Sequence, residues 1–156
     1  MNSAKAFPET EYVELYNTTD KAIELNGWSF LYGSKPTVLT ALLLDADGYV
    51  VLYRSGRDIH IDDAGLDLPL DKFPASLVNT GKELALFDPS GKEIDRIAYE
   101  KAKVGIAWER SETGFHLSTD ERGGTPGSAN SSPDDEPEDP DRPDTPHKPG
   151  IPTDII

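Results

Sequence analysis

The sequence Glu11-Tyr-Val-Glu-Leu-Tyr-Asn17, followed by Leu25-Asn-Gly-Trp28, decides the fold of this chain. Val13 and Leu15 share one side of an extended segment, and the aromatic and acidic residues between them share the other, which predicts a half-buried strand. A turn-forming Asn-Thr-Thr-Asp sequence then leads to a second short strand at residues 22–25. The Asn-Gly pair that follows predicts a hairpin.

The pattern of short strand segments separated by turn residues continues as far as residue 130. Further strands are expected at residues 28–32, 38–44, 49–53, 82–87, 93–99, 106–110 and 115–117. Many short strands separated by turn residues indicate a sandwich or barrel. Residues 54–76 are predicted to form a surface loop, which Leu66, Leu68 and Leu70 pin to the core.

The composition changes at residue 131. Residues 131–156 hold seven of the thirteen prolines, and the last six, from Pro137 to Pro152, recur at every third position. That period is the period of polyproline II. The segment has eight acidic and two basic residues and no aromatic residue. It lacks the apolar surface to fold alone, so we predict a disordered acidic Pro-rich linker or tail behind one domain of residues 9–130.

The charge and the residue types restrict the partners of the chain. A net charge of −14 over 156 residues argues against nucleic acid, whose phosphates attract Lys- and Arg-rich surfaces. No segment approaches the ~20 apolar residues of a membrane span, so we expect no membrane insertion. The chain has no cysteine, which removes disulfides and thiol chemistry from consideration.

Six landmarks follow the opening segment in a fixed order. They are Gly-Tyr-Val-Val-Leu at 48–52, Asn-Thr-Gly at 79–81, Asp-Pro-Ser-Gly at 88–91, an Asp-containing strand ending in Tyr at 95–99, Gly-x-x-x-Glu-Arg at 105–110 and Gly-Thr-Pro-Gly-x-x-Asn at 124–130. Together they resemble the lamin tail domain family. The resemblance implies an immunoglobulin-like β-sandwich with a binding or scaffolding role. For bacterial members it also implies a place in an exported or cell-surface protein.

The ends of the chain depart from that pattern. Such domains usually begin with a strand that reads like Val-Ile-Asn-Glu-Val, whereas only residues 1–8 precede the first strand here and Pro8 interrupts them. We therefore expect an N-terminal strand to be missing and residues 12–16 to form an open sheet edge, which invites self-association. Residues 151–156 are either the start of a following domain or a strand that docks into a neighbouring copy.

The histidines stand at positions 60, 116 and 147. His60 and Asp62 share one face of an extended chain, a spacing that suits a metal, although two ligands in an acidic loop more often lie in solvent. His116, Ser118 and Asp120 have the residue types of a hydrolytic triad, but a triad converges across a fold and these residues follow one another along a strand end. We predict no catalytic residue, no cofactor and no metal site.

The acidic turns at residues 45–48 and 88–91 lack the alternating ligand series of an EF-hand, and we interpret both as hairpin turns. Irregular calcium binding by Asp58, Asp62 and Asp63 remains an alternative.

Glu14 and Asp95 are carboxylates within predicted strands. A glycosidase pair needs both to face an open cleft, whereas a structural role has them accept backbone N–H groups or pair with arginine; we favour the structural role. Trp28 and Trp108 would form a sugar-stacking platform if they were exposed, but tryptophan in a small β-sandwich usually belongs to the core.

These observations predict an all-β, immunoglobulin-like β-sandwich that is not an enzyme. We expect a non-catalytic binding or structural module of a larger bacterial secreted or cell-surface protein, which mediates attachment to an unidentified protein partner. The alternative is a calcium- or carbohydrate-dependent adhesion domain accessory to an exported hydrolase. The extracytoplasmic location rests on the resemblance alone.

Overall fold

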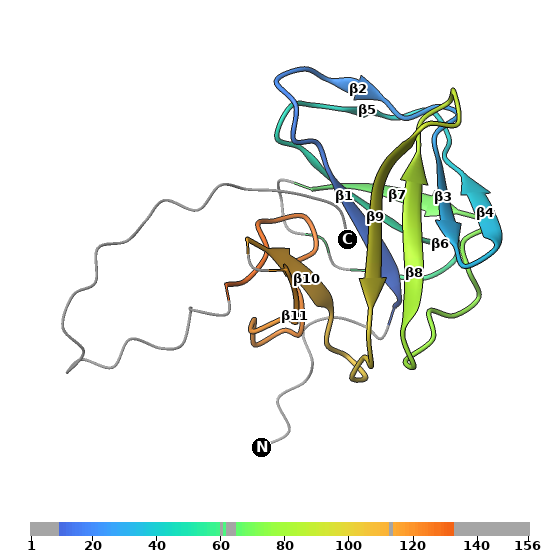
Figure 1. Ribbon diagram of the computed structural model, residues 1–156. Coiled ribbons are helices and arrows are strands. Elements are labelled where there is room, and N and C mark those ends of the chain that lie inside the picture. The colour runs from blue at the N-terminus through green and yellow to red at the C-terminus, as the bar shows by residue number, and fades with distance from the viewer. Residues whose placement is uncertain (1–9, 60, 62–64, 113, 133–156) are drawn as a thin grey trace.

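The computed structural model describes residues 10–59, 61, 65–112 and 114–132. Within these residues the chain forms eleven β-strands and no helix, so the all-β prediction is confirmed (Figure 1). The strands are β1 (Tyr12–Tyr16), β2 (Ile23–Glu24), β3 (Ser29–Tyr32), β4 (Lys35–Val38), β5 (Leu43–Leu44), β6 (Tyr49–Arg54), β7 (Gly65–Leu70), β8 (Lys82–Phe87), β9 (Glu93–Tyr99), β10 (Trp108–Ser111) and β11 (Gly114–Leu117). Nearly all of the predicted acidic tail lies outside the described residues.

The strands form two larger sheets and two short ribbons. The order β4-β3-β8-β9 gives an antiparallel sheet of four strands, and the order β1-β6-β7 gives a sheet of three. In the second sheet β1 is antiparallel to β6 and β7 is parallel to it. β2 pairs with β5, and β10 pairs with β11. One apolar core contains residues of both larger sheets, which agrees with an immunoglobulin-like sandwich.

β6 shows why the core lies where it does. Val50, Val51 and Leu52 are completely buried, because β6 is the central strand of its sheet and both of its faces are covered. A strand in that position reads as a continuous apolar run instead of an alternating one. Phe30 from the opposite sheet is also buried in this core. Burial of each of these Val, Leu and Phe side chains contributes about 1.5–3 kcal/mol to folding.

β1 is buried on both faces, whereas the sequence predicts burial on one. Glu14 and Tyr16, on the face away from the core, are only 6% and 8% exposed. The N–H of Gly127 donates to Glu14 Oε2 at 2.5 Å, and the Tyr16 ring packs 4.6 Å from that of Tyr49. β1 nevertheless lies at an edge of its sheet, as the sequence predicts.

Asn17 ends β1 and holds two connections together. Its side chain is 3% exposed, and Nδ2 donates to the carbonyl oxygens of Lys21 at 2.8 Å, Leu44 at 3.1 Å and Asp45 at 3.0 Å. Oδ1 accepts the N–H of Thr19 at 3.0 Å, an Asx turn that reverses the chain after β1. The asparagine of the opening motif therefore fixes the β1–β2 turn and the β5–β6 connection to each other.

The apolar run at residues 38–44 is not one buried strand, and that prediction is wrong. β4 ends at Val38, which is 61% exposed, and β5 contains only Leu43 and Leu44. Between them the buried Leu39 donates its N–H to the carbonyl oxygen of Trp28 at 2.7 Å. The run passes from the four-stranded sheet, which contains β4, to the β2–β5 ribbon. A continuous apolar sequence gives no indication of where the strand ends.

The predicted loop at residues 54–76 contains β7. Leu68 and Leu70 are buried as expected, but Leu66 is 41% exposed and does not pin the segment to the core. Pro69 argues against a strand in sequence terms, yet an edge strand accepts proline because one side of its backbone needs no partner.

The three predicted hairpin turns have different outcomes. Residues 88–91 join the paired strands β8 and β9, and Asp88 Oδ1 accepts the N–H groups of Ser90 at 2.8 Å and Lys92 at 3.0 Å. Residues 26–27 and 45–48 are turns but not hairpins, because the strands that flank each of them belong to different sheets. Turn residues reveal that the chain reverses there, but pairing partners are set by the rest of the fold.

Candidate functional site

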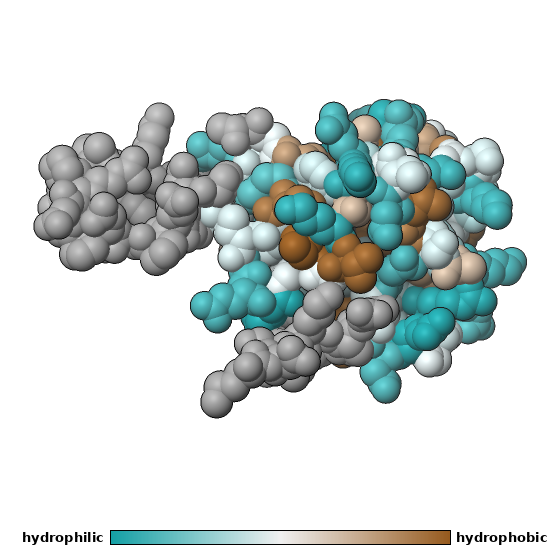
Figure 2. All heavy atoms as spheres, turned by 90° about the horizontal axis from the view of Figure 1, so that it is seen from below, coloured by the Kyte–Doolittle hydropathy of each residue, from teal (hydrophilic) through white to brown (hydrophobic). Residues whose placement is uncertain are grey.

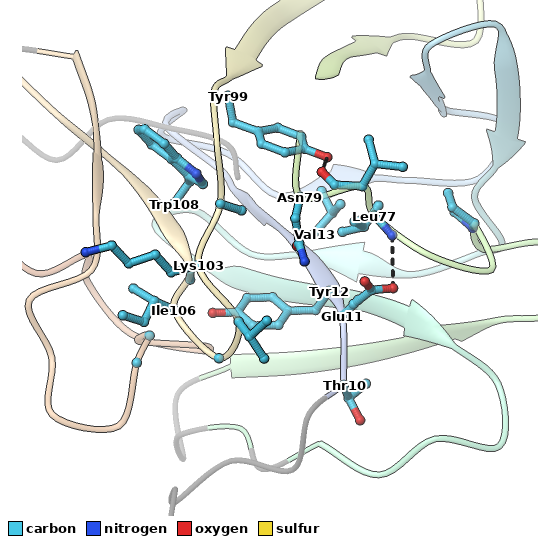
Figure 3. A pocket seen from close by; sticks show the side chains of 18 of the residues that line it. Thr10, Glu11, Tyr12, Val13, Leu77, Asn79, Tyr99, Lys103, Ile106 and Trp108 are labelled. Carbon is cyan, nitrogen blue, oxygen red and sulfur yellow. Dashed lines mark hydrogen bonds between the residues drawn. The ribbon is translucent and has the colours of Figure 1, made fainter. Parts of the chain in front are cut away.

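A cavity of about 360 Å³ opens between β1 and β9, each of which lies at an edge of its sheet. Its walls come from residues 10–13, from β8 and β9, and from residues 102–108, which lead from β9 into β10 (Figure 3). These segments meet at the lower end of the sandwich in Figure 1, and Figure 2 shows that face with apolar side chains gathered among hydrophilic ones. The volume falls at the lower end of the ~300–1,000 Å³ range of ligand pockets.

The inner surface of the cavity is apolar. Val13 of β1, Leu84 of β8 and Ile97 of β9 line it, and all three belong to the buried core. Leu84 and Ile97 are direct cross-strand partners, so their side chains lie next to each other on the same face. The alternation of β1, β8 and β9 therefore places apolar side chains where the edges of the two sheets face each other.

Two tyrosines brace one wall. The Tyr99 hydroxyl donates to the carbonyl oxygen of Val78 at 2.9 Å, and the N–H of Val78 donates to the Tyr32 hydroxyl at 2.5 Å. The two hydroxyl oxygens lie 3.3 Å apart. Burial, and after it the hydrogen bond with Tyr32, raises the pKa of Tyr99, so this phenol stays neutral at physiological pH.

Tyr12 and Trp108 bring polar atoms to the cavity. In Figure 3 the Tyr12 side chain points to the opposite side of the strand from that of Glu11. Burial, and after it the charge of Glu14, raises the pKa of Tyr12, so its hydroxyl keeps its proton. Trp108 Nε1 is shielded from solvent and has no hydrogen-bond partner within the described part of the chain. An unpaired buried donor costs about 1–3 kcal/mol, and an acceptor that reached this indole N–H would recover that cost.

The lining is positively charged although the chain is acidic. Four basic residues line the cavity, namely Arg54, Arg57, Lys103 and Arg122, against the single described carboxylate of Glu11. Glu11 accepts the N–H of Leu77 at 2.9 Å (Figure 3). Arg57 and Lys103 are exposed, and the described residues provide neither with an ion-pair partner. The mouth of the cavity therefore favours an acidic occupant.

The three residues with the composition of a triad are held by separate contacts. Both ring nitrogens of His116 lie 2.9 Å from backbone carbonyl oxygens. The Ser118 hydroxyl lies 3.3 Å from that of Ser131, and Asp120 pairs with Arg122 at 2.9 Å. The hydrogen bond from Arg122 lowers the pKa of Asp120. These contacts bind the end of the domain to the β10–β11 ribbon.

The carboxylates of the predicted strands make the contacts expected of structural groups. Glu14 accepts the N–H of Gly127, and Asp95 forms an ion pair with Arg110 at 2.9 Å. Both observations agree with the structural interpretation of these residues. Asp95 lies beside a narrow cleft of about 10 Å³ further along β1 and β9, too small for a sugar ring.

A second buried carboxylate, besides Glu14, was missed by the sequence reasoning. Glu109 is 3% exposed, and its Oε1 accepts the hydroxyl of Thr125 at 2.8 Å while its Oε2 accepts the N–H of Ser131 at 2.9 Å. Glu109 is the glutamate of the Gly-x-x-x-Glu-Arg motif, which could have drawn attention to it. The neighbouring sequence does not show, however, that a segment from the end of the domain covers this side chain. Glu109 and Glu14 together hold residues 125–131 against the sandwich.

The residues weighed as alternative metal ligands are described only in part. His60, Asp62 and Asp63 lie outside the described residues, and so does His147. Where the structure describes the chain, no group of three or more His, Asp or Glu side chains is placed to hold a metal ion. The carboxylate of Asp47 in the turn at 45–48 accepts the Tyr16 hydroxyl at 2.9 Å.

The two tryptophans have different roles. Trp28 packs against the core, so the core interpretation is confirmed for it. For Trp108 that interpretation is wrong, because the residue is only partly buried and is not part of the core cluster; its side chain lines the cavity (Figure 3). The sequence predicted one side of the cavity, namely the open sheet edge at residues 12–16. It did not show that residues 102–108 pass beside that edge.

The sequence model of the Lamin Tail Domain family matches residues 1–101, which is more than half of the chain. The chain belongs to the lamin tail domain family. Lamin tail domains are non-enzymatic immunoglobulin-like domains that act as protein-interaction modules. In this lamin tail domain β10 and β11 lie beyond the matched residues, and Trp108 lies beyond them too.

No curated protein matches this lamin tail domain. Among its described residues, no helix has the length and hydrophobicity needed to cross a membrane.

Proposed function

We propose that this lamin tail domain is a non-catalytic attachment module that binds a segment of a partner protein in a groove, defined as the cavity between β1 and β9 together with its mouth. The observation that carries the proposal is Trp108, whose side chain lines the apolar cavity and whose buried Nε1–H is unpaired among the described residues. A backbone carbonyl of a bound segment would satisfy this donor, and an apolar side chain would fill the space above Val13 and Ile97.

The location of the groove supports a polypeptide as its ligand. The groove lies between two edge strands, and edge strands are where added polypeptide segments most often bind. The non-catalytic part of the proposal has separate support. Glu14, Asp95 and His116, which were considered as catalytic residues, all make contacts that hold the domain together.

We further propose that the module belongs to a larger bacterial protein that is secreted or held at the cell surface. The support is the family membership together with an acidic, Pro-rich segment whose composition suits a spacer between domains. Digestion of intact cells of the source organism with an external protease tests the location. Degradation of the chain while a cytoplasmic marker survives is the expected result, and full protection would contradict it.

Selection of peptide ligands tests the binding function. Peptides from a random library are selected on the full chain, and their affinities are measured by calorimetry for the wild type, Ile97→Asp and Val38→Asp. Ile97 lines the groove in β9, whereas Val38 is 61% exposed in β4 at the other edge of the same sheet. We expect Ile97→Asp to weaken binding at least tenfold and Val38→Asp to leave it unchanged. Because Ile97 is also a core residue, Trp108→Phe serves as the milder second variant.

If the selected peptides bind equally well to all the groove variants, the groove is not the attachment surface. If peptide-binding sites map to scattered surfaces instead, the proposal fails as a whole.

The calcium- or carbohydrate-dependent alternative keeps one observation in its favour, the presence of Tyr12, Tyr99 and Trp108 around one cavity. Sugars stack on aromatic side chains of this kind. Calorimetric titration with calcium and with a panel of oligosaccharides decides it. Saturable heat with a sugar that disappears in Trp108→Ala would replace protein attachment as the function.

A further inference from the structure

The groove has the chemistry that recognises a polyproline II helix. Such segments dock in aromatic-lined grooves, where proline rings pack against the aromatic faces. Tyr12, Tyr99 and Trp108 supply the aromatic side chains of this groove. A polyproline II helix has no internal hydrogen bonds, so its carbonyl oxygens are free to accept the buried Trp108 Nε1–H.

The charge of the groove narrows the choice of ligand. Arg57 and Lys103 stand exposed at its lining in a chain whose net charge is −14. Opposite charges across a contact increase the association rate and exclude the wrong ligands. The best fit is therefore a polyproline II segment that is also acidic.

This chain contains such a segment. From residue 135 to residue 146 the sequence reads Asp-Glu-Pro, Glu-Asp-Pro, Asp-Arg-Pro, Asp-Thr-Pro. Because polyproline II has three residues per turn, prolines at every third position share one face; a second face is wholly acidic, and the third carries two acidic residues with Arg142 and Thr145. The proline face would meet the aromatic side chains while the acidic face meets the basic mouth.

The segment is also long enough to reach the groove. Residues 122–124 line the groove, and Ser131, a few residues later, is fixed to the domain by its N–H bond to Glu109 Oε2 at 2.9 Å. The 16 residues 133–148, which follow Ser132 directly, extend to about 50 Å in polyproline II, at ~3.1 Å per residue. A domain of this size has a radius of gyration of only about 14 Å, so length places no limit on docking.

We propose that residues 133–148 dock in the groove of their own chain as a polyproline II segment and compete there with the partner. The inference rests on the proposed function, since both ligands use the same groove. It adds regulation: the module binds its partner only when the partner displaces the segment.

The indole N–H resonances of the full-length chain test this docking. The chain has two tryptophans, so nitrogen-15 NMR shows two indole signals, and Trp28→Phe assigns the one from Trp108. The wild type is compared with a variant that carries Pro137→Ala, Pro140→Ala, Pro143→Ala and Pro146→Ala. We expect the Trp108 signal to differ between the two chains and the Trp28 signal to coincide. Coincident Trp108 signals would overturn the proposal, and a difference that grows with protein concentration would overturn docking within one chain.

A synthetic peptide of residues 133–148 provides the second measurement. Added to the full-length proline-to-alanine variant, it should bind saturably, and Trp108→Phe should weaken it about tenfold through loss of one buried hydrogen bond. Val38→Asp should leave binding unchanged, and a peptide of the same composition with the triplet period shuffled should bind at least tenfold more weakly. Equal binding of the native and shuffled peptides would overturn polyproline II recognition.

The two proposals fail in different ways. If the 133–148 peptide does not bind while library peptides still bind at Trp108, the tail proposal is wrong and the attachment function stands. If neither binds, both are wrong.

Discussion

Replacing Asn17 by aspartate should destabilise the domain strongly, although the two side chains have the same shape. Asn17 Nδ2 donates to three backbone carbonyl oxygens at 2.8–3.1 Å, and Oδ1 accepts from Thr19. Aspartate keeps the acceptor but turns the donor into a charged oxygen that faces three carbonyl oxygens. The contact with the Leu44 carbonyl is buried, so water does not readily take over there.

The magnitude follows from those contacts. An amide has two N–H hydrogens, so at least two hydrogen bonds of about 1 kcal/mol each are lost. One buried carbonyl left unpaired adds about 1–3 kcal/mol, and repulsion between like partial charges adds to it. We therefore expect Asn17→Asp to lower the free energy of unfolding by about 3–5 kcal/mol. Asn17→Ala loses the same donor bonds and also the acceptor, but it brings no charge towards the carbonyl oxygens and leaves space for a water that can donate to them, so it should cost less, about 2–3 kcal/mol.

The assay is equilibrium unfolding in urea, followed by tryptophan fluorescence and analysed by linear extrapolation. Asn26→Asp is the matched control, because Asn26 is exposed in a turn and its substitution should change stability by less than about 0.5 kcal/mol. The order of the two Asn17 variants decides the matter. If aspartate is tolerated better than alanine, the acceptor contact to Thr19 matters more than the donor contacts, and the reasoning is wrong.

Three further predictions concern the segments around the groove. Gly123→Ala should lower the free energy of unfolding by about 2–4 kcal/mol in urea, because Gly123 has φ +90° and an added Cβ would meet the Gly105 carbonyl oxygen; a change below about 0.5 kcal/mol would contradict this. Glu14→Gln should cost about 1–3 kcal/mol by the same assay, because it replaces a buried carboxylate that accepts a backbone N–H, and an unchanged urea midpoint would show that the charge has no role. Asp120→Asn should cost about 0.5 kcal/mol at neutral pH. Since Arg122 lowers the pKa of Asp120 in the folded state, its contribution is present above the unfolded-state pKa and is lost as the pH falls through the folded-state pKa, so the variant and the wild type should converge in acid.

Some of this fold could be predicted from the sequence because its signals are local. β8 and β9 were expected with the same bounds as observed, since their residues alternate and the Asp88–Gly91 turn between them carries its own side-chain hydrogen bonds. β7 was missed because the stretch at residues 54–76 is long and rich in Asp and Gly, which suggested a loop; its Pro69 is accepted because β7 lies at a sheet edge, and edge position is not a local property.

The candidate site could be predicted only in outline. The sequence predicted that β1 lies at an open edge, and the structure confirms the edge. It did not predict that Trp108 stands beside that edge, because residues 102–108 are far from β1 in the chain. Nor did the sequence show the basic mouth, since Arg57 and Lys103 come from two connections that only folding brings together.

The sequence by itself determined strands such as β1, β8 and β9, the turn chemistry, the family and the acidic proline period, because alternation, turn residues and residue spacing act over a few neighbours. Only the tertiary structure decided which faces are buried and where the groove lies. Burial depends on what covers a face, and for Glu14 the cover is Gly127, more than a hundred residues away. The opening Tyr-Val-Glu-Leu-Tyr segment thus specifies a strand, while the rest of the chain makes one side of it core and places its first residues at the wall of the cavity.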